Sequence, residues 1–239
     1  SRVCPGCGRW RDGCSGKAND RVFSLKIPNH KLAFENNTIH NTEDAKYGAT
    51  IEFIGIDEFY LINCKFINNS MYTPSGDEYS GGCGLWICRN EGISYYRELI
   101  QINYSNCKWI NNSINKLYGG GAIQIGISTL ANIELTFSKC EFIENKALRG
   151  NGGALSIQTI QPLTISECIF SNNGVNSPNG FGGAIYINPN FDGRNTQNYM
   201  SNCDIINCTF EGNYAPTSNG HAICMEGGVD TLLSIFSNN

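Results

Sequence analysis

The sequence predicts an all-β solenoid, in which the chain winds through short parallel strands in about six to seven stacked coils. Three observations predict this fold class. An aromatic-x-x-Asn motif recurs seven times, and a small residue followed by apolar-x-apolar recurs six times in alternation with it. No stretch has the apolar period of an amphipathic helix. Because one coil buries its apolar side chains only against its neighbours, such repeats are typical of stacked architectures.

The composition excludes several classes of protein. Of 239 residues, 16% are charged and the net charge is −4, whereas nucleic-acid binding needs a basic face. With 41% hydrophobic residues, the chain has enough apolar material for a core, which excludes intrinsic disorder. No apolar run reaches the roughly 18 residues of a membrane-spanning helix. The sequence starts at Ser1 with no apolar signal-like stretch, so we expect a removed targeting segment or a trimmed chain.

The first motif places an aromatic residue three positions before Asn. The spacing between its copies runs from 26 residues (Phe210 to Phe236) to 43 residues (Phe66 to Trp109), which suits one full coil. The copies are Phe34-x-x-Asn37, Phe66-x-x-Asn69, Trp109-x-x-Asn112, Phe142-x-x-Asn145, Phe170-x-x-Asn173, Phe210-x-x-Asn213 and Phe236-x-x-Asn239. Five copies carry Cys two residues before the aromatic residue: Cys64, Cys107, Cys140, Cys168 and Cys208.

The second motif predicts another strand in each coil. Its clearest copies are Gly121-Ala122-Ile123-Gln124-Ile125, Gly153-Ala154-Leu155-Ser156-Ile157 and Gly183-Ala184-Ile185-Tyr186-Ile187. A third strand is expected ahead of each Cys, because apolar residues lie three and five positions upstream, as at Leu61 and Phe59. The extra residue before Cys predicts a bend. We therefore expect three short strands per coil, with the Gly residues at corners that have no room for a Cβ.

The repeated residues are expected to form internal ladders. Equivalent residues of stacked coils lie about 4.8 Å apart, so inward Asn side chains can hydrogen-bond along the stack. The expected members are Phe66, Trp109, Phe142, Phe170 and Phe210; Asn69, Asn112, Asn145, Asn173 and Asn213; and the five Cys residues named above. We interpret these positions as structural, and the Cys column as buried thiols.

The alternation of Phe-x-x-Asn with Gly-Gly-Ala-Ile/Leu resembles the repeats of the polymorphic outer membrane protein family, over roughly residues 30–239. The resemblance implies a right-handed parallel β-helix displayed outside a cell, usually for adhesion. No C-terminal membrane-barrel segment is present, and Cys residues and glycosylation sequons are denser than in bacterial members. Both departures favour a eukaryotic microbe or a fragment.

Glycosylation and disulfides are expected in an extracellular protein of this kind. Five Asn-x-Ser/Thr sequons occur at positions that are mostly polar in other repeats, and we expect at least one to carry a glycan: Asn36, Asn68, Asn103, Asn111 and Asn207. Residues 1–24 are expected to form a Cys- and Gly-rich cap on the β-helix domain of residues 25–239. The disulfide candidates are Cys4, Cys7, Cys14, Cys83 and Cys88. A zinc site at Cys4-x-x-Cys7 lacks a close second pair of ligands, and a redox motif lacks its βαβ context.

No catalytic, metal or cofactor site is predicted. Parallel β-helices also include polysaccharide lyases and hydrolases, but such chemistry needs clustered acids and bases or carboxylates that hold Ca²⁺. The 21 carboxylates are mostly scattered over turns, and the adjacent pair Asp57-Glu58 would point to opposite faces of a strand. The pair Asp77-Glu78 lies in an expected loop. An enzyme is therefore the least favoured of three hypotheses.

Binding is predicted where the coils lengthen. From the small residue of the second motif to the next Cys, the distance is 14 residues at Thr50–Cys64, 23 at Gly84–Cys107 and 24 at Ala184–Cys208. We expect both insertions to leave the same corner, three coils or about 14 Å apart. Their candidate binding residues are Tyr95, Tyr96, Arg97, Phe191 and Arg194. A third insertion, residues 71–80, is expected at a different corner.

Three functional hypotheses follow from these observations. The first is a secreted or cell-surface glycoprotein that acts as an adhesin or interaction module, with a protein or glycan as partner. The second is a structural subunit that stacks with copies of itself into an extracellular filament or coat. The third is a polysaccharide lyase or hydrolase.

Overall fold

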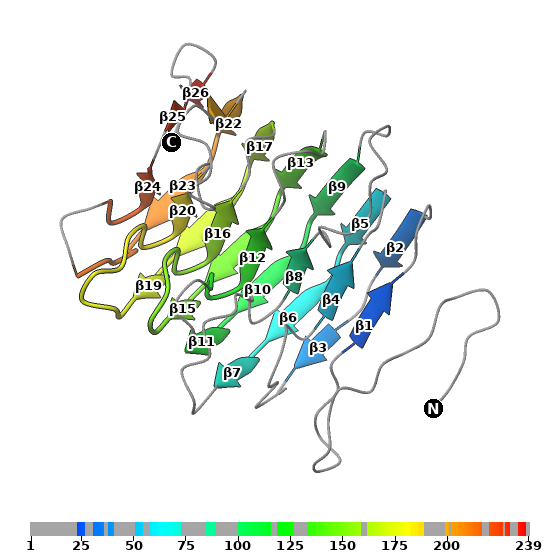
Figure 1. Ribbon diagram of the computed structural model, residues 1–239, viewed down its shortest axis with the longest axis horizontal. Coiled ribbons are helices and arrows are strands. Elements are labelled where there is room, and N and C mark those ends of the chain that lie inside the picture. Colours follow the sequence, from blue (N-terminus) through cyan, green and yellow to red (C-terminus); the bar gives the residue numbers. More distant parts are fainter. Residues whose placement is uncertain are drawn as a thin grey trace.

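The computed structural model describes strands in five parallel sheets, and the described part of the chain contains no helix (Figure 1). The described residues are 23–26, 31–35, 38–40, 51–54, 58–72, 85–88, 100–115, 119–126, 133–158, 162–188, 199–200, 202–216, 220–226, 228–229 and 234–237. The expected cap of residues 1–24 lies outside them, except for Phe23 and Ser24, which begin the first strand.

Two seven-stranded sheets and one six-stranded sheet form the three long faces. Sheet A contains, in order, β1 (Phe23–Lys26), β4 (Ile51–Ile54), β8 (Leu85–Cys88), β12 (Ile123–Gly126), β16 (Leu155–Gln158), β20 (Ile185–Ile187) and β24 (Ile223–Met225). Sheet B contains β2 (Lys31–Glu35), β5 (Glu58–Ile62), β9 (Ile100–Ser105), β13 (Ile133–Ser138), β17 (Leu163–Ser166), β22 (Cys203–Ile206) and β26 (Ser234–Ser237). Sheet C contains β3 (Thr38–His40), β6 (Lys65–Ile67), β10 (Lys108–Ile110), β14 (Glu141–Ile143), β18 (Ile169–Ser171) and β23 (Thr209–Glu211).

Two smaller sheets complete the arrangement. Sheet D contains β7 (Ser70–Tyr72), β11 (Ser113–Asn115), β15 (Lys146–Ala147) and β19 (Gly174–Val175), and sheet E pairs β21 (Tyr199–Met200) with β25 (Gly228–Val229). The sequence predicted three strands per coil, and sheet D adds a fourth in four consecutive coils. Its inward residues Ile114, Ala147 and Val175 are fully buried. This strand was missed because two or three residues are too few to display a period.

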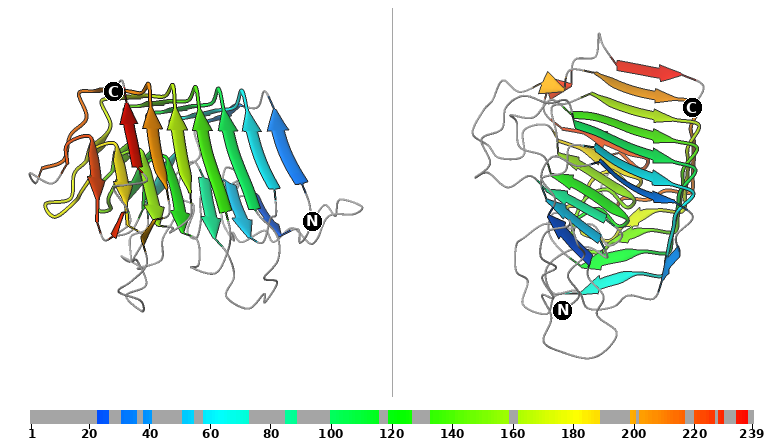
Figure 2. Two further views of the ribbon diagram at one scale, coloured as in Figure 1. Left: turned by 90° about the horizontal axis from the view of Figure 1, so that it is seen from above. Right: turned by 90° about the vertical axis from the view of Figure 1, so that its right-hand side faces the viewer.

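The chain visits sheets A, B and C in turn and then returns to the next strand of sheet A. We call one such passage a rung. Every strand pair between rungs is parallel, for example β12 with β16 and β13 with β17. In Figure 2 the strands of each sheet follow one another from blue to red along the long axis. The all-β class and the stacked parallel strands predicted from the sequence are confirmed.

Two corners of each rung use left-handed backbone. The residue before each Cys of the ladder and the residue before each ladder Asn both have φ between 52° and 62°. The members are Asn63, Asn106, Lys139, Glu167 and Asn207 at the corner from sheet B to sheet C, and Asn68, Asn111, Glu144, Asn172 and Gly212 at the corner after sheet C. Asn and Gly tolerate this region better than other residues, which explains their frequency here. The bend predicted ahead of Cys is therefore a left-handed residue.

The ladder Asn side chains satisfy the backbone amides that follow one of these corners. The amide of Asn112 donates to Oδ1 of Asn145 in the next rung over 3.1 Å, and Asn112 Nδ2 donates to the same oxygen over 2.9 Å. Asn145 Nδ2 also donates to the carbonyl of Trp109 over 2.9 Å. The same pattern joins Asn69 to Asn112, Asn145 to Asn173 and Asn173 to Asn213. The Oδ1 atom of the Asn in the next rung thus accepts the hydrogen bond of a backbone amide at the corner, in place of a backbone carbonyl.

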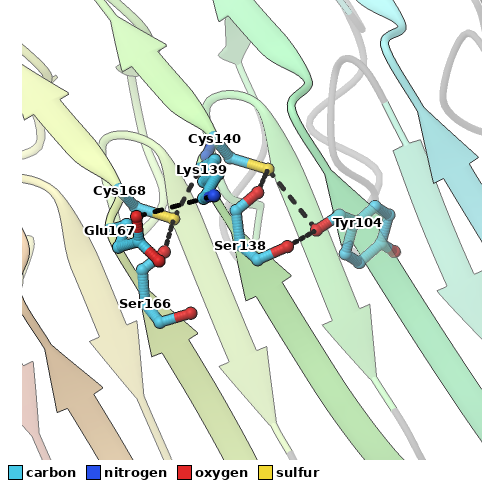
Figure 3. A network of polar contacts seen from close by, with 7 residues as sticks. All are labelled: Tyr104, Ser138, Lys139, Cys140, Ser166, Glu167 and Cys168. Carbon is cyan, nitrogen blue, oxygen red and sulfur yellow. Dashed lines mark hydrogen bonds and ion pairs between the residues drawn. The ribbon is translucent and has the colours of Figure 1, made fainter.

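The Cys ladder serves the other corner in the same way (Figure 3). The amide of Cys140 donates to Sγ of Cys168 over 3.4 Å, and Cys64 donates likewise to Cys107. Each thiol also contacts the carbonyl two residues upstream, as Cys168 Sγ does with Ser166 over 3.3 Å. All five thiols are at most 2% exposed. These residues were expected to act as small hydrophobic groups, and their hydrogen bonds show that they are also polar linkers.

The aromatic ladder forms one internal stack, as expected. Ring centroids are 5.5 Å apart for Phe66 and Trp109, 4.7 Å for Trp109 and Phe142, 4.8 Å for Phe142 and Phe170, and 4.9 Å for Phe170 and Phe210. The planes of neighbouring rings lie within 5° of parallel. These rings and the inward residues of sheets A and B make up a continuous core.

Two of the seven aromatic motifs belong to a different column. Phe34 lies in sheet B opposite Leu61, and Phe236 lies in the same sheet. Ile39 occupies the sheet C position beside Phe66. The first and last of the seven motifs therefore lie outside the aromatic ladder. The pairing of whole strands between rungs determines which sheet an aromatic residue joins. The local spacing between the aromatic residue and Asn does not determine this.

Glycines close the corner before sheet A because the next rung approaches closely there. A Cβ added to Gly153 would lie 2.0 Å from the carbonyl oxygen of Gly183 and 2.5 Å from the amide nitrogen of Gly174. Both neighbours are backbone atoms, which cannot rotate away. By contrast, a Cβ added to Gly174 would meet its nearest atom, the carbonyl oxygen of Tyr214, at 3.7 Å.

Gly153→Ala is therefore expected to destabilise the protein by about 1–3 kcal/mol or more, the usual range for overpacking. Gly174→Ala, one corner away, should change the free energy of unfolding by less than about 0.5 kcal/mol. Urea denaturation of both variants checks this difference. Equal stability of the two variants would contradict the close approach of the rungs.

Candidate functional site

The insertions that carry the predicted binding residues connect sheet A to sheet B. One insertion follows β8 and precedes β9, and the other follows β20 and precedes β22. In sheet A, β8 and β20 are separated by β12 and β16, so the insertions start about 14 Å apart along the stack. The residues themselves, Tyr95, Tyr96, Arg97, Phe191 and Arg194, lie outside the described residues. The third insertion follows β7 of sheet D, and therefore leaves a different corner.

Three of the five sequon asparagines lie at left-handed corners. Asn68, Asn111 and Asn207 are exposed and have φ of 52–54°. Asn111 Nδ2 donates to Asn68 Oδ1 of the preceding rung over 2.9 Å. Asn103 lies within β9 and is half-buried, and Asn36 lies outside the described residues.

All seven cysteines whose side chains the structure describes are free thiols. Burial raises the pKa of the Cys140 thiol, and its hydrogen bonds with Cys107 and Cys168 raise it further. Burial, followed by the charge of Asp204, raises the pKa of Cys203 to about 12. These groups stay protonated at neutral pH and are poor nucleophiles. The disulfide candidates Cys4, Cys7, Cys14 and Cys83 lie outside the described residues, as does the side chain of Cys88.

Within the described ranges, no three His, Cys, Asp or Glu side chains are grouped so that they would hold a metal ion. The described carboxylates with close cationic partners belong to surface pairs, Lys108 with Glu141 at 2.7 Å and Lys139 with Glu167 at 3.8 Å. No helical segment in the same ranges has the length and hydropathy needed to cross a membrane.

An unexpected polar patch lies on the outer face of sheet A. Gln124, Ser156 and Tyr186 share one register column, which Cys224 continues. Gln158 lies two residues after Ser156, and so on the same face. Gln124 is 0%, Ser156 1%, Gln158 5% and Tyr186 4% exposed, although these positions point away from the core. Among the described residues, neither amide atom of Gln124, nor Ser156 Oγ, nor Gln158 Oε1 has a hydrogen-bond partner.

The hydroxyl of Tyr186, in the same column, has both a hydrogen-bond acceptor and a donor as partners. It donates to Glu226 Oε2 over 2.6 Å and accepts from Asn188 Nδ2 over 2.9 Å. Burial raises the pKa of Tyr186, and the hydrogen bond to the Glu226 carboxylate raises it further. The neutral phenol is therefore the form that the fold favours.

Stability should consequently fall in alkali. Because the pKa of Tyr186 is higher in the folded than in the unfolded state, its contribution is complete below the unfolded value of about 10 and is lost as pH rises above it. Denaturation at pH 8–11 should show a weaker pH dependence for Tyr186→Phe than for the wild type. Tyr214→Phe, at a ring that is 51% exposed, is the matched control and should follow the wild type. Identical slopes for all three proteins would contradict this assignment.

Sequence reasoning missed this patch for a simple reason. Alternation predicts which face of a strand a residue occupies but not whether that face is covered, so the burial of the middle residue of apolar-x-apolar cannot be predicted from the motif. One signal was available: the middle residues Gln124, Ser156 and Tyr186 are all uncharged, whereas solvent-facing strand residues often carry charge.

Comparison of this chain with protein-family models, with curated proteins and with solved structures found no match.

Proposed function

We propose that this protein is a secreted or cell-surface adhesin or interaction module, which binds a protein or glycan partner without catalysis. The observation that carries the proposal is the separation of its core from its insertions. The Phe, Asn and Cys ladders satisfy one another across consecutive rungs. The two longest connections from sheet A to sheet B start at β8 and β20, on the same side of the stack. Insertions on one face of a repeat fold commonly form its binding surface.

The proposal includes a right-handed parallel β-helix of about six to seven coils. Handedness is supported by the general rule that a crossover between parallel strands of one sheet is right-handed in about 98% of cases. Seven strands in each of sheets A and B support the coil number. The resemblance of the motifs to the polymorphic outer membrane protein repeats implies the same handedness.

Glycosylation in the secretory pathway is part of the same proposal. Asn68, Asn111 and Asn207 are exposed at corners, which supports attachment of a glycan there. The Cys-rich cap and its disulfides at Cys4, Cys7 and Cys14 are proposed on the sequence alone. The ladder thiols are at most 2% exposed, which is compatible with an oxidising compartment, because burial shields them from oxidants.

Shortening both insertions tests the proposed function. A variant with residues 89–98 and 189–197 replaced by short Gly-Ser linkers should lose binding to a panel of immobilised matrix proteins and glycans. Its unfolding midpoint should stay near that of the wild type, since loops outside the stacked core contribute little burial. Shortening the part of the third insertion that follows β7, residues 73–80, is the matched control and should leave binding intact. Unchanged binding by the double variant would contradict the proposal.

A second candidate is a subunit that stacks into a filament or coat. It is supported by the half-buried Phe210, Ile223 and Met225, which pack against one end of the core. Another copy stacked at this end would bury them further. Negative-stain microscopy of the purified protein separates the two candidates, because end-to-end rods are expected from the second and single particles from the first.

A further inference from the structure

The aromatic and Asn ladders both end beside β23, the last strand of sheet C. Phe170 is 0% exposed in the rung before, whereas Phe210 of β23 is half-buried. Asn173 is also 0% exposed, whereas Asn213 is half-buried. Both neighbours of Phe210 in the strand are exposed. The end of the two ladders is therefore accessible to another molecule.

The last internal junction shows how an aromatic residue and the Asn three positions later join one rung to the next. Oδ1 of Asn213 accepts from the backbone amide and from Nδ2 of Asn173, each over 3.0 Å. Nδ2 of Asn213 donates to the carbonyl of Phe170 over 2.8 Å. The ring centroids of Phe170 and Phe210 lie 4.9 Å apart. One added strand thus brings a ring, an acceptor and a donor to the strand before it.

The groups that would continue this pattern beyond β23 have no partner among the described residues. In four junctions, the Nδ2 of the later rung donates to the carbonyl of the aromatic residue before it, but no described donor reaches the carbonyl of Phe210. Likewise, no described acceptor takes the backbone amide of Asn213 or the second hydrogen of its Nδ2. The outer edge of β23 therefore offers an aromatic face, one acceptor and two donors. An unpaired strand edge with such groups is a template for a further strand.

The first rung of another copy does not match this edge. The first strand of its sheet C is β3, where Ile39 occupies the column of Phe66, and the sequence has Thr42 three residues later. A copy stacked head-to-tail through β3 would bring neither a ring to Phe210 nor an Asn to Asn213. The edge instead matches a strand that carries the aromatic-x-x-Asn motif.

We infer that the outer edge of β23 binds an extended segment of another polypeptide that carries an aromatic-x-x-Asn motif, and adds it to sheet C as a parallel strand. The ring of the segment stacks on Phe210, and its Asn meets Asn213 as Asn213 meets Asn173. In this mode of recognition, backbone hydrogen bonds give affinity and side-chain contacts give specificity. The site belongs to sheet C, whereas the insertions connect sheet A to sheet B, so the inference goes beyond the proposed function.

Fluorescence anisotropy of a labelled peptide with the sequence of residues 139–147, titrated with the full chain, tests the inference. Saturable binding is expected. Phe142→Ala or Asn145→Ala in the peptide should weaken binding by more than about tenfold, because each removes one half of the junction. Glu141→Ala in the peptide is the matched control and should bind like the unmodified peptide, since this side chain lies on the outer face of its strand. These changes leave the protein itself unaltered.

Variants of the protein locate the binding site. Asn213→Ala should weaken peptide binding by more than about tenfold, because the added Asn loses the donor Nδ2 of that side chain. Thr209→Ala, at an exposed position of the same strand, is the matched control and should bind like the wild type. The variant with both insertions shortened should also bind the peptide normally.

The outcomes separate this inference from the proposed function. Binding that requires both the peptide motif and Asn213 supports the inference, whatever the insertions bind. Absence of peptide binding, equal binding of all the peptides, or equal binding by Asn213→Ala overturns it. Assembly of the wild type into rods that excess peptide does not dissociate also overturns it, because another copy then occupies the edge. Loss of matrix-protein or glycan binding when the insertions are shortened supports the proposed function and leaves the peptide result unaffected.

Discussion

Replacing Phe142 by alanine is expected to lower the free energy of unfolding by about 3–5 kcal/mol, the range for truncating a buried Phe. Its ring is 0% exposed and stacks between Trp109 at 4.7 Å and Phe170 at 4.8 Å. It also meets Phe137 of sheet B edge-on at 6.0 Å. Because neighbouring rungs are held apart by backbone hydrogen bonds, they cannot collapse into the space left by the ring, and the full cavity cost remains.

Urea denaturation followed by tryptophan fluorescence measures this effect. Ile169→Ala is the matched control, because that side chain is 42% exposed on the outer face of the adjacent strand β18. It should change stability by no more than about 0.5 kcal/mol. A Phe142→Ala variant as stable as the wild type would show that the inward and outward faces of sheet C have been exchanged.

Replacing Asn145 by alanine is expected to cost about 3–5 kcal/mol for a different reason. The side chain takes part in four hydrogen bonds: two from Asn112, one to the carbonyl of Trp109 and one to Asn173 Oδ1. Its loss leaves the buried amide of Asn112 without that acceptor, and a buried group without a partner costs about 1–3 kcal/mol. The lost hydrogen bonds add about 0.5–1.5 kcal/mol each, offset where the surrounding groups find other partners.

Asn172→Gly is the matched control for this prediction. Asn172 is also an asparagine beside a rung corner, but it is exposed, and its φ of 54° is one that glycine adopts easily. We expect its stability to stay within about 0.5 kcal/mol of the wild type, measured by the same urea denaturation. A larger loss at Asn172 than at Asn145 would exclude the internal Asn ladder as a main source of stability.

The internal columns were readable from the sequence because a ladder requires the same residue in every rung. Phe142, Cys140 and Asn145 each have equivalents at regular spacing, and the strands around them alternate with a period of two. The bend before Cys was also expected. Its left-handed backbone was not visible at Lys139 and Glu167, since neither residue type favours that conformation and the pairing of the rungs imposes it.

Register and coverage depended on contacts between distant parts of the chain. Phe34 carries the same local motif as Phe66, yet pairs in sheet B, because hydrogen bonding between whole strands outweighs the spacing of one aromatic residue. Gln124 and Ser156 follow the outward alternation predicted for them, yet they are buried. Alternation along a strand is a local property of the backbone and could be predicted. Whether an outward side chain meets water depends on what covers that face in the folded protein, so only the tertiary structure reveals that these outward positions of sheet A are buried.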